Sequence, residues 1–191
     1  MITLRQLQRL WDAKEYRRIM ARLLELRPEG SPAAIAQLTE GVAAAAMIVI
    51  RLDELNQPYT ALCRNLIREI LSAQQSDGGW IDAMSSALCL RALVCGHGQG
   101  PAIDRGLAYL ANLQRPEGLW PKEPLRRMPG DPLVTVFVLY ELFEDQRFAQ
   151  MARIDLATRW FDLHRRELDT DTARLWKCVS MRPRAMAGAW S

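Results

Sequence analysis

Two aspartates near the end of the chain, Asp169 and Asp171, are the residues best placed for chemistry. They stand at the start of the last helix that the sequence predicts, about residues 169–180. Neighbouring carboxyl groups in an apolar setting are desolvated and repel each other's charge, so one of them keeps its proton and can act as a general acid. The alternative is structural, because acidic residues at a helix N-terminus cap free N–H groups and suit the helix dipole.

Other residue types that carry chemistry are sparse. Cys95 and His97 are the only close Cys/His pair, and two ligands do not make a zinc site. His164 has only Asp162 and Glu167 as acidic neighbours in sequence, which favours an exposed or helix-end histidine over a catalyst. The chain contains no glycine-rich phosphate loop and no Gly-x-Ser-x-Gly nucleophile motif. We therefore expect no metal and no cofactor.

A short pattern, Gln-x3-Gly-x-Trp, occurs twice in register, at residues 74–80 and 114–120. A fixed period of this size between helical patterns is typical of a helical repeat protein. We expect the glutamine to hydrogen-bond loose backbone groups at a helix end, the glycine to permit a left-handed turn, and the tryptophan to pin the loop through its apolar area. The residues concerned are Gln74, Gly78, Trp80, Gln114, Gly118 and Trp120.

The rest of the chain consists of successive helical patterns without a convincing strand. Amphipathic helices alternate with mostly apolar ones, which predicts an inner buried layer and an outer half-solvated layer. The apolar helices also align with one another, with Ser86 matching Thr135 and with Asp82 and Asp131 four residues before them. The sequence thus predicts an all-α fold of four antiparallel hairpins. The expected helices cover about residues 3–26, 32–52, 58–72, 82–95, 102–113, 131–143, 148–167 and 169–180.

The repeated spacing resembles the QW motif of squalene and terpenoid cyclases. The phrase from Gln75 to Trp80 also resembles loops of protein prenyltransferase β subunits and of complement-type thioester domains. These families share the α/α toroid, so the resemblance implies a partial α/α toroid of about four antiparallel helical hairpins. It covers residues 57–143 well and the flanks only by hairpin count, within a single domain of residues 1–191.

The resemblance also gives a meaning to the acid pair. Class II terpenoid cyclases carry Asp-x-Asp-Asp at the start of an inner helix, where the middle acid protonates an alkene or epoxide. Here Thr172 replaces the final aspartate, and no repeat loop precedes the pair. Our first hypothesis is a non-catalytic binding or assembly module that holds a hydrophobic ligand or a protein partner. The alternative is a small class II cyclase-like enzyme with Asp169 and Asp171 as the acid pair.

Composition limits the setting and the partners. The net charge of +3 over 191 residues is too mild to predict nucleic-acid binding. The longest apolar run, Val42 to Ile50, is far shorter than the ~20 residues that cross a bilayer. We expect no signal peptide, no transmembrane segment, and a reducing, cytoplasmic location.

Because four hairpins cannot close a ring, we expect a homodimer or a ring completed by a partner. The cysteines show no paired spacing; they are Cys63, Cys89, Cys95 and Cys178.

Overall fold

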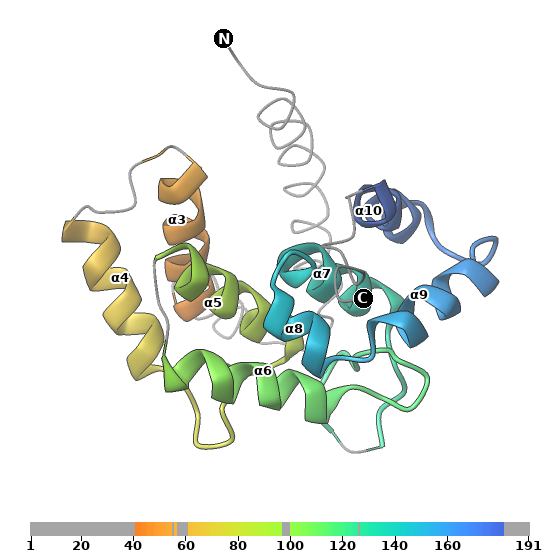
Figure 1. Ribbon diagram of the computed structural model, residues 1–191, viewed down its shortest axis with the longest axis horizontal. Helices are drawn as coiled ribbons and strands as arrows, with labels where there is room; N and C mark the ends of the chain where they lie inside the picture. Colours follow the sequence, from red (N-terminus) through yellow and green to blue (C-terminus); the bar gives the residue numbers. More distant parts are fainter. Residues whose placement is uncertain (1–40, 55, 57–60, 97–99, 126, 182–191) are drawn as a thin grey trace, which may run out of the picture.

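The computed structural model describes residues 41–54, 56, 61–96, 100–125 and 127–181 (Figure 1). The helix expected at residues 3–26 and the start of the one expected at 32–52 lie outside these ranges. Within them the secondary structure is helical, apart from one isolated β-bridge, so the all-α prediction is confirmed. The helices are α3 (Val42–Glu54), α4 (Ala61–Ser72), α5 (Ala83–Cys95), α6 (Pro101–Leu113), α7 (Pro132–Leu142), α8 (Gln146–Met151), α9 (Ile154–Leu163) and α10 (Thr170–Met181).

Aspartate caps explain where α5 and α7 begin. The side chain of Asp82 accepts a hydrogen bond from Ser85 N at 2.8 Å, and that of Asp131 accepts one from Val134 N at 2.9 Å. Pro132 then occupies the first turn of α7, where a missing N–H costs nothing. Both helices start where the sequence predicts, because the N-cap side chains satisfy backbone donors that the helix leaves open.

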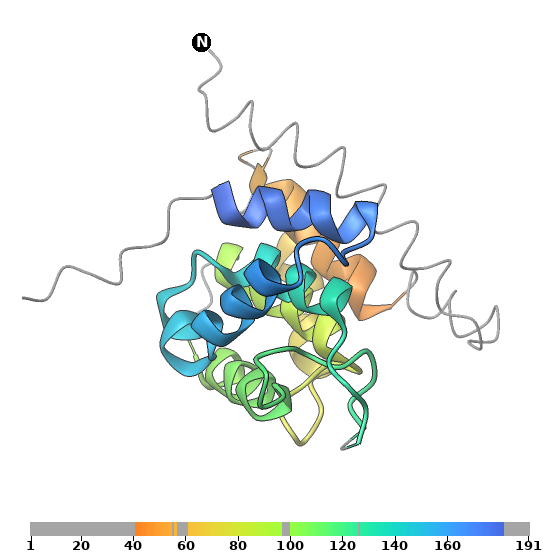
Figure 2. The same cartoon turned by 90° about the vertical axis from the view of Figure 1, so that its right-hand side faces the viewer.

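The helices form two rows. In one row α3 packs on α5, α5 on α7 and α7 on α10; we call this the inner row. The outer row follows beside it, with α4 against α3 and α5, α6 against α5 and α8, and α9 against α7. Figure 1 shows α4, α6, α8 and α9 along the left, lower and right sides of α5 and α7, and Figure 2 shows α10 lying over α7. The alternation of apolar and amphipathic helices therefore separates the two rows.

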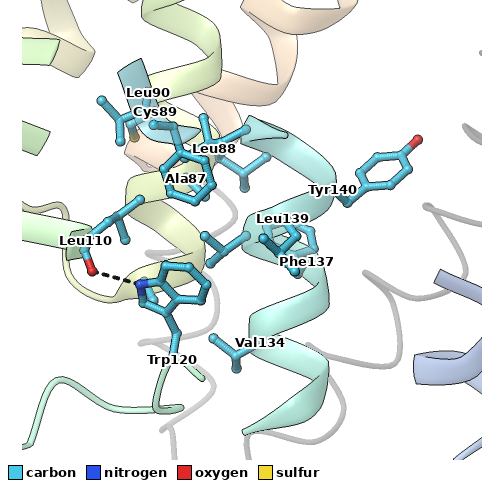
Figure 3. Close-up of a cluster of buried hydrophobic side chains, with 14 of the residues drawn as sticks. Ala87, Leu88, Cys89, Leu90, Leu110, Trp120, Val134, Phe137, Leu139 and Tyr140 are labelled. Carbon is cyan, nitrogen blue, oxygen red and sulfur yellow. Dashed lines mark hydrogen bonds between the residues drawn. The ribbon is translucent and has the colours of Figure 1, made fainter. Parts of the chain in front are cut away.

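The core lies between these rows and is filled by large side chains. Every residue of α7 from Val134 to Leu142 is buried, which accounts for its nearly continuous apolar sequence. Figure 3 shows how side chains of α5 and α7 surround Trp120. The largest fully buried side chains are Trp80, Trp120, Phe137, Phe148, Phe161, Ile70, Leu88, Leu90, Ile103, Leu107 and Leu110.

The prediction of a single helix at residues 148–167 was wrong. The structure has two helices there, because Ala152 has φ −91 and ψ 148 and so leaves the helical conformation between α8 and α9. The physical reason is the next residue, Arg153, whose backbone N–H and C=O both bond to the side chain of Gln114. The bond from Arg153 N to Gln114 replaces the bond that this N–H would make in a continuous helix, whereas Arg153 O also accepts a bond from Ala157 N within α9.

Candidate functional site

The first repeat loop, residues 74–80, is tied to α6 by one glutamine side chain. Gln74 Nε2 donates to Gly78 O at 2.8 Å within the loop and to Ala102 O at 2.8 Å in the first turn of α6. Its Oε1 accepts a hydrogen bond from Arg105 Nη2 at 2.7 Å. Gln74 therefore closes the loop and attaches it to the following outer helix.

The second repeat loop, residues 114–120, uses the same arrangement at the start of α9. Gln114 Nε2 donates to Gly118 O at 2.7 Å and to Arg153 O at 3.3 Å, while its Oε1 accepts from Arg153 N at 2.8 Å. The guanidinium of Arg153 also donates to Gln114 O at 2.7 Å. By these contacts α9 takes the place that α6 has beside the first repeat loop, so α8 is an additional short helix of the second repeat.

Each tryptophan of the repeat joins its loop to the preceding outer helix. Trp80 Nε1 donates to Ile70 O in α4 at 2.8 Å, and Trp120 Nε1 donates to Leu110 O in α6 at 2.8 Å (Figure 3). Both indoles are fully buried. A large ring with its one donor satisfied contributes apolar burial without an unpaired polar group.

The aligned hydroxyls of the inner helices bind the same tryptophans. Trp80 N donates to Ser86 Oγ at 2.8 Å, and Trp120 N donates to Thr135 Oγ1 at 2.8 Å. The hydroxyl thus satisfies a backbone N–H at the point where the loop enters α5 or α7. Together these bonds link an outer helix, a loop, the next inner helix and the next outer helix, which is a structural role for all six repeat residues.

Asp169 and Asp171 lie together at the start of α10. Asp169 Oδ1 accepts hydrogen bonds from Asp171 N at 2.9 Å and from Thr172 N at 3.1 Å, and its Oδ2 accepts one from Thr172 Oγ1 at 2.6 Å. These are the bonds of a helix N-cap. Asp171, in the first turn, is only 5% exposed.

The remaining sequence candidates include His164 at the end of α9 and Cys95 at the end of α5. His164 follows α9, where its Nδ1 lies 2.8 Å from Trp160 O and its ring stacks on Trp160. All four cysteines are thiols, and Cys63 and Cys89 are buried. His97 lies outside the described residues. Across the described part of the chain, no three His, Cys, Asp or Glu side chains are grouped so that they could hold a metal ion.

A buried ion pair between α5 and α7 is a feature that the sequence analysis missed. Arg91 Nε lies 3.4 Å from Glu141 Oε2, and the Glu141 side chain is 3% exposed. Burial of Arg91 lowers its pKa, but the opposite effects of Glu141 and other acidic neighbours are together larger. The pKa of Arg91 therefore stands above its ordinary value, and the guanidinium is charged. Burial also raises the pKa of the nearby Cys95 thiol to about 12, against a lowering effect of Arg91. A thiol in this state is a poor nucleophile at neutral pH.

Tyr109 of α6 packs against the first repeat loop. Its ring leaves no room for a Cβ at Gly79, and its hydroxyl is buried with no hydrogen-bond partner among the described residues. Burial, followed by Asp77 and Asp82, raises the pKa of Tyr109 to about 12. The hydroxyl is therefore neutral and desolvated, which is a cost to the folded state.

Comparisons of the chain with protein-family models, with curated proteins and with solved structures give no match. In the described ranges, no helix combines the length and the apolar character that crossing a membrane requires.

Proposed function

We propose that the chain is a non-catalytic binding or assembly module with the hairpin arrangement of a partial α/α toroid. Two equivalent repeat loops and a row of consecutively packed inner helices support this arrangement. An array of this type has end helices that lack one neighbour of the row, and such ends need a cap or a partner.

The observation that carries the proposal is the exposed apolar edge of α3. Met47 is 37% and Ile48 is 44% exposed, whereas Ala45, Ala46 and Val49 of the same helix are buried. Because α3 packs on α4 and α5 through its buried face, the exposed pair lies on a side that these two helices leave uncovered. Among the described residues α3 is the first helix of the inner row, and adjacent exposed apolar residues on such a helix suit a protein interface.

A protein partner is favoured over a small hydrophobic ligand. The inner helices fill the space between them with their own side chains, since Val136, Phe137 and Leu139 are fully buried. A ligand site for a hydrophobic small molecule needs a concave apolar pocket. The edge of α3 instead offers a surface that a second copy of the chain, or another chain, completes.

The test is a paired substitution of Met47→Lys and Ile48→Glu, with Leu163→Glu on α9 as the matched control because Leu163 is 73% exposed. Light scattering at micromolar concentration is expected to give a dimer or larger species for the wild type and for the control. The paired variant is expected to be a monomer with the same helix content by circular dichroism. A monodisperse wild-type monomer that binds no hydrophobic dye overturns the proposal.

A second candidate function, a class II cyclase-like enzyme, is favoured by one observation. Asp171 is buried two residues after Asp169, and a buried carboxyl group beside a second one is the residue type that such an acid pair needs. In that mechanism Asp171 gives its proton to an alkene or epoxide and Asp169 accepts hydrogen bonds beside it. Incubation with a linear polyprenyl epoxide, with products analysed by mass spectrometry, is expected to give cyclic isomers that Asp171→Asn abolishes. Absence of such products with the folded wild type refutes this candidate.

A further inference from the structure

The second repeat carries an inserted loop that the fold does not need. One residue separates Trp80 from Asp82, whereas the ten residues from Pro121 to Gly130 separate Trp120 from Asp131. The closing hydrogen bonds are nevertheless equivalent, since Asp82 N donates to Trp80 O at 2.7 Å and Asp131 N donates to Trp120 O at 2.8 Å. We call residues 121–130 the insert loop. The first repeat shows that the chain can enter an inner helix without it.

The described residues of the insert loop, 121–125 and 127–130, make defined contacts. Pro121 and Gly130 form an antiparallel bridge at its base. Arg115 Nε donates to Met128 O at 2.8 Å, and its Nη2 donates to Leu125 O. In the first repeat loop the residue at this position is Gln75, so the arginine belongs to the repeat that has the insert.

Anchoring of this kind matters for binding. A loop that is already ordered loses less conformational freedom when a partner covers it, and that loss otherwise opposes association. Insertions in repeat proteins also gather on loops that often form the binding face. In Figure 1 the insert loop runs along the lower right of the molecule, away from α3 at the upper left.

The insert loop has an exposed apolar side chain and a sequence that is mainly basic. Leu125 is 56% exposed, and it begins a turn in which Met128 N donates to Leu125 O at 3.1 Å. The loop sequence contains three basic residues and one acidic residue, Glu123, and the side chain of Arg127 is exposed. A surface that receives this loop needs an apolar pocket with carboxylates at its rim.

We propose that the insert loop is a docking element for an acidic protein segment, with Leu125 in an apolar pocket and Arg127 beside carboxylates. The inference rests on the proposed function in so far as the module holds protein partners, and it adds a second binding face to the α3 edge. A single exposed leucine and the acidic Glu123 suit a protein surface better than a nucleic acid, whose binding depends on phosphate neutralisation.

The experiment selects random displayed peptides on the full chain. Selection is expected to enrich peptides that combine Asp or Glu with an apolar residue, and their binding is expected to weaken with salt. Leu125→Ser and Arg127→Glu are each expected to lower the affinity about tenfold, a size typical of a contact at the centre of an interface. Replacing the insert loop by one glycine is expected to abolish binding; glycine is chosen because Ile81, the single residue there in the first repeat, has φ +65.

The outcomes separate this inference from the proposed function. Peptides that bind all three loop variants as well as the wild type overturn the inference, as does enrichment without acidic residues or loop-dependent binding of a single-stranded oligonucleotide. Unchanged helix content of the point variants shows that lost binding is not lost folding. If Met47→Lys with Ile48→Glu abolishes peptide binding and the loop variants do not, the inference fails while the binding module stands.

Discussion

Substituting Gly78 by alanine tests whether the repeat loops hold the fold together. Gly78 has φ +93, and a Cβ there would lie 2.5 Å from Arg105 O, a backbone atom of α6. A left-handed conformation costs an L-residue about 1–2 kcal/mol, and overpacking against a fixed neighbour costs typically about 1–3 kcal/mol. We therefore expect Gly78→Ala to lower the free energy of unfolding by about 2–5 kcal/mol. That loss is a large share of the free energy of unfolding of a typical domain, which is ~5–15 kcal/mol.

The control is Gly100→Ala at the start of α6. Gly100 has an extended backbone with φ 165, and no heavy atom lies within 4 Å of a Cβ built there. Alanine is a poorer N-cap than glycine, which lowers the stability of the folded state. Alanine also reduces the conformational entropy of the unfolded chain, which raises the stability, so the net change should be within about 1 kcal/mol. Urea unfolding followed by tryptophan fluorescence measures all variants, because Trp80 and Trp120 are fully buried. If Gly78→Ala is as stable as Gly100→Ala, the reasoning about the loop is refuted.

Three further predictions concern polar side chains. Tyr109→Phe removes an unpartnered hydroxyl and is expected to raise stability by about 1 kcal/mol in urea. Because the pKa of Tyr109 is raised from 10 to about 12, the wild type is expected to lose stability from pH 10 to 12, and the variant is expected to lose less in that window. Glu141→Gln removes the carboxylate that pairs with Arg91 and is expected to cost about 3–5 kcal/mol, most of which Arg91→Met in the same chain should restore in a double-mutant cycle. Asp169→Ala should cost about 1 kcal/mol of unfolding free energy in urea as a lost cap. Asp171→Ala should leave the oligomeric state in light scattering unchanged if the chain is a binding module, and it should abolish turnover if the chain is an enzyme.

The sequence predicted much of this fold because its signals were local. The caps Asp82 and Asp131 set the starts of α5 and α7, and each acts on backbone groups within three residues of itself. The break before α9 was not predictable in this way. It depends on Gln114, which is 39 residues away and accepts the hydrogen bond of the Arg153 N–H. The spacing of apolar residues along a helix does not show that a distant side chain will bind one of its backbone groups.

The Arg91–Glu141 pair could have been found from the sequence. Each residue is the only charged one in its otherwise apolar helix, and the two charges are opposite. The alignment of Ser86 with Thr135 places Arg91 level with Tyr140, next to Glu141. Lone opposite charges at the same level of two neighbouring buried helices predict an ion pair, because an unpaired buried charge would be too costly.

The two repeats differ in ways that separate architecture from candidate function. Gln74 and Gln114 make corresponding bonds to the loop glycine and to the next outer helix, although the second repeat contains an insert loop and the extra helix α8. The repeated bonds therefore set how hairpins join and are insensitive to what is added between them. A binding function that is specific to this chain should depend on the parts that the two repeats do not share. These parts are the insert loop and the ends of the inner row. The repeated motif is for that reason a guide to the fold, and the insert loop with its Arg115 anchor is the better place to search for a partner.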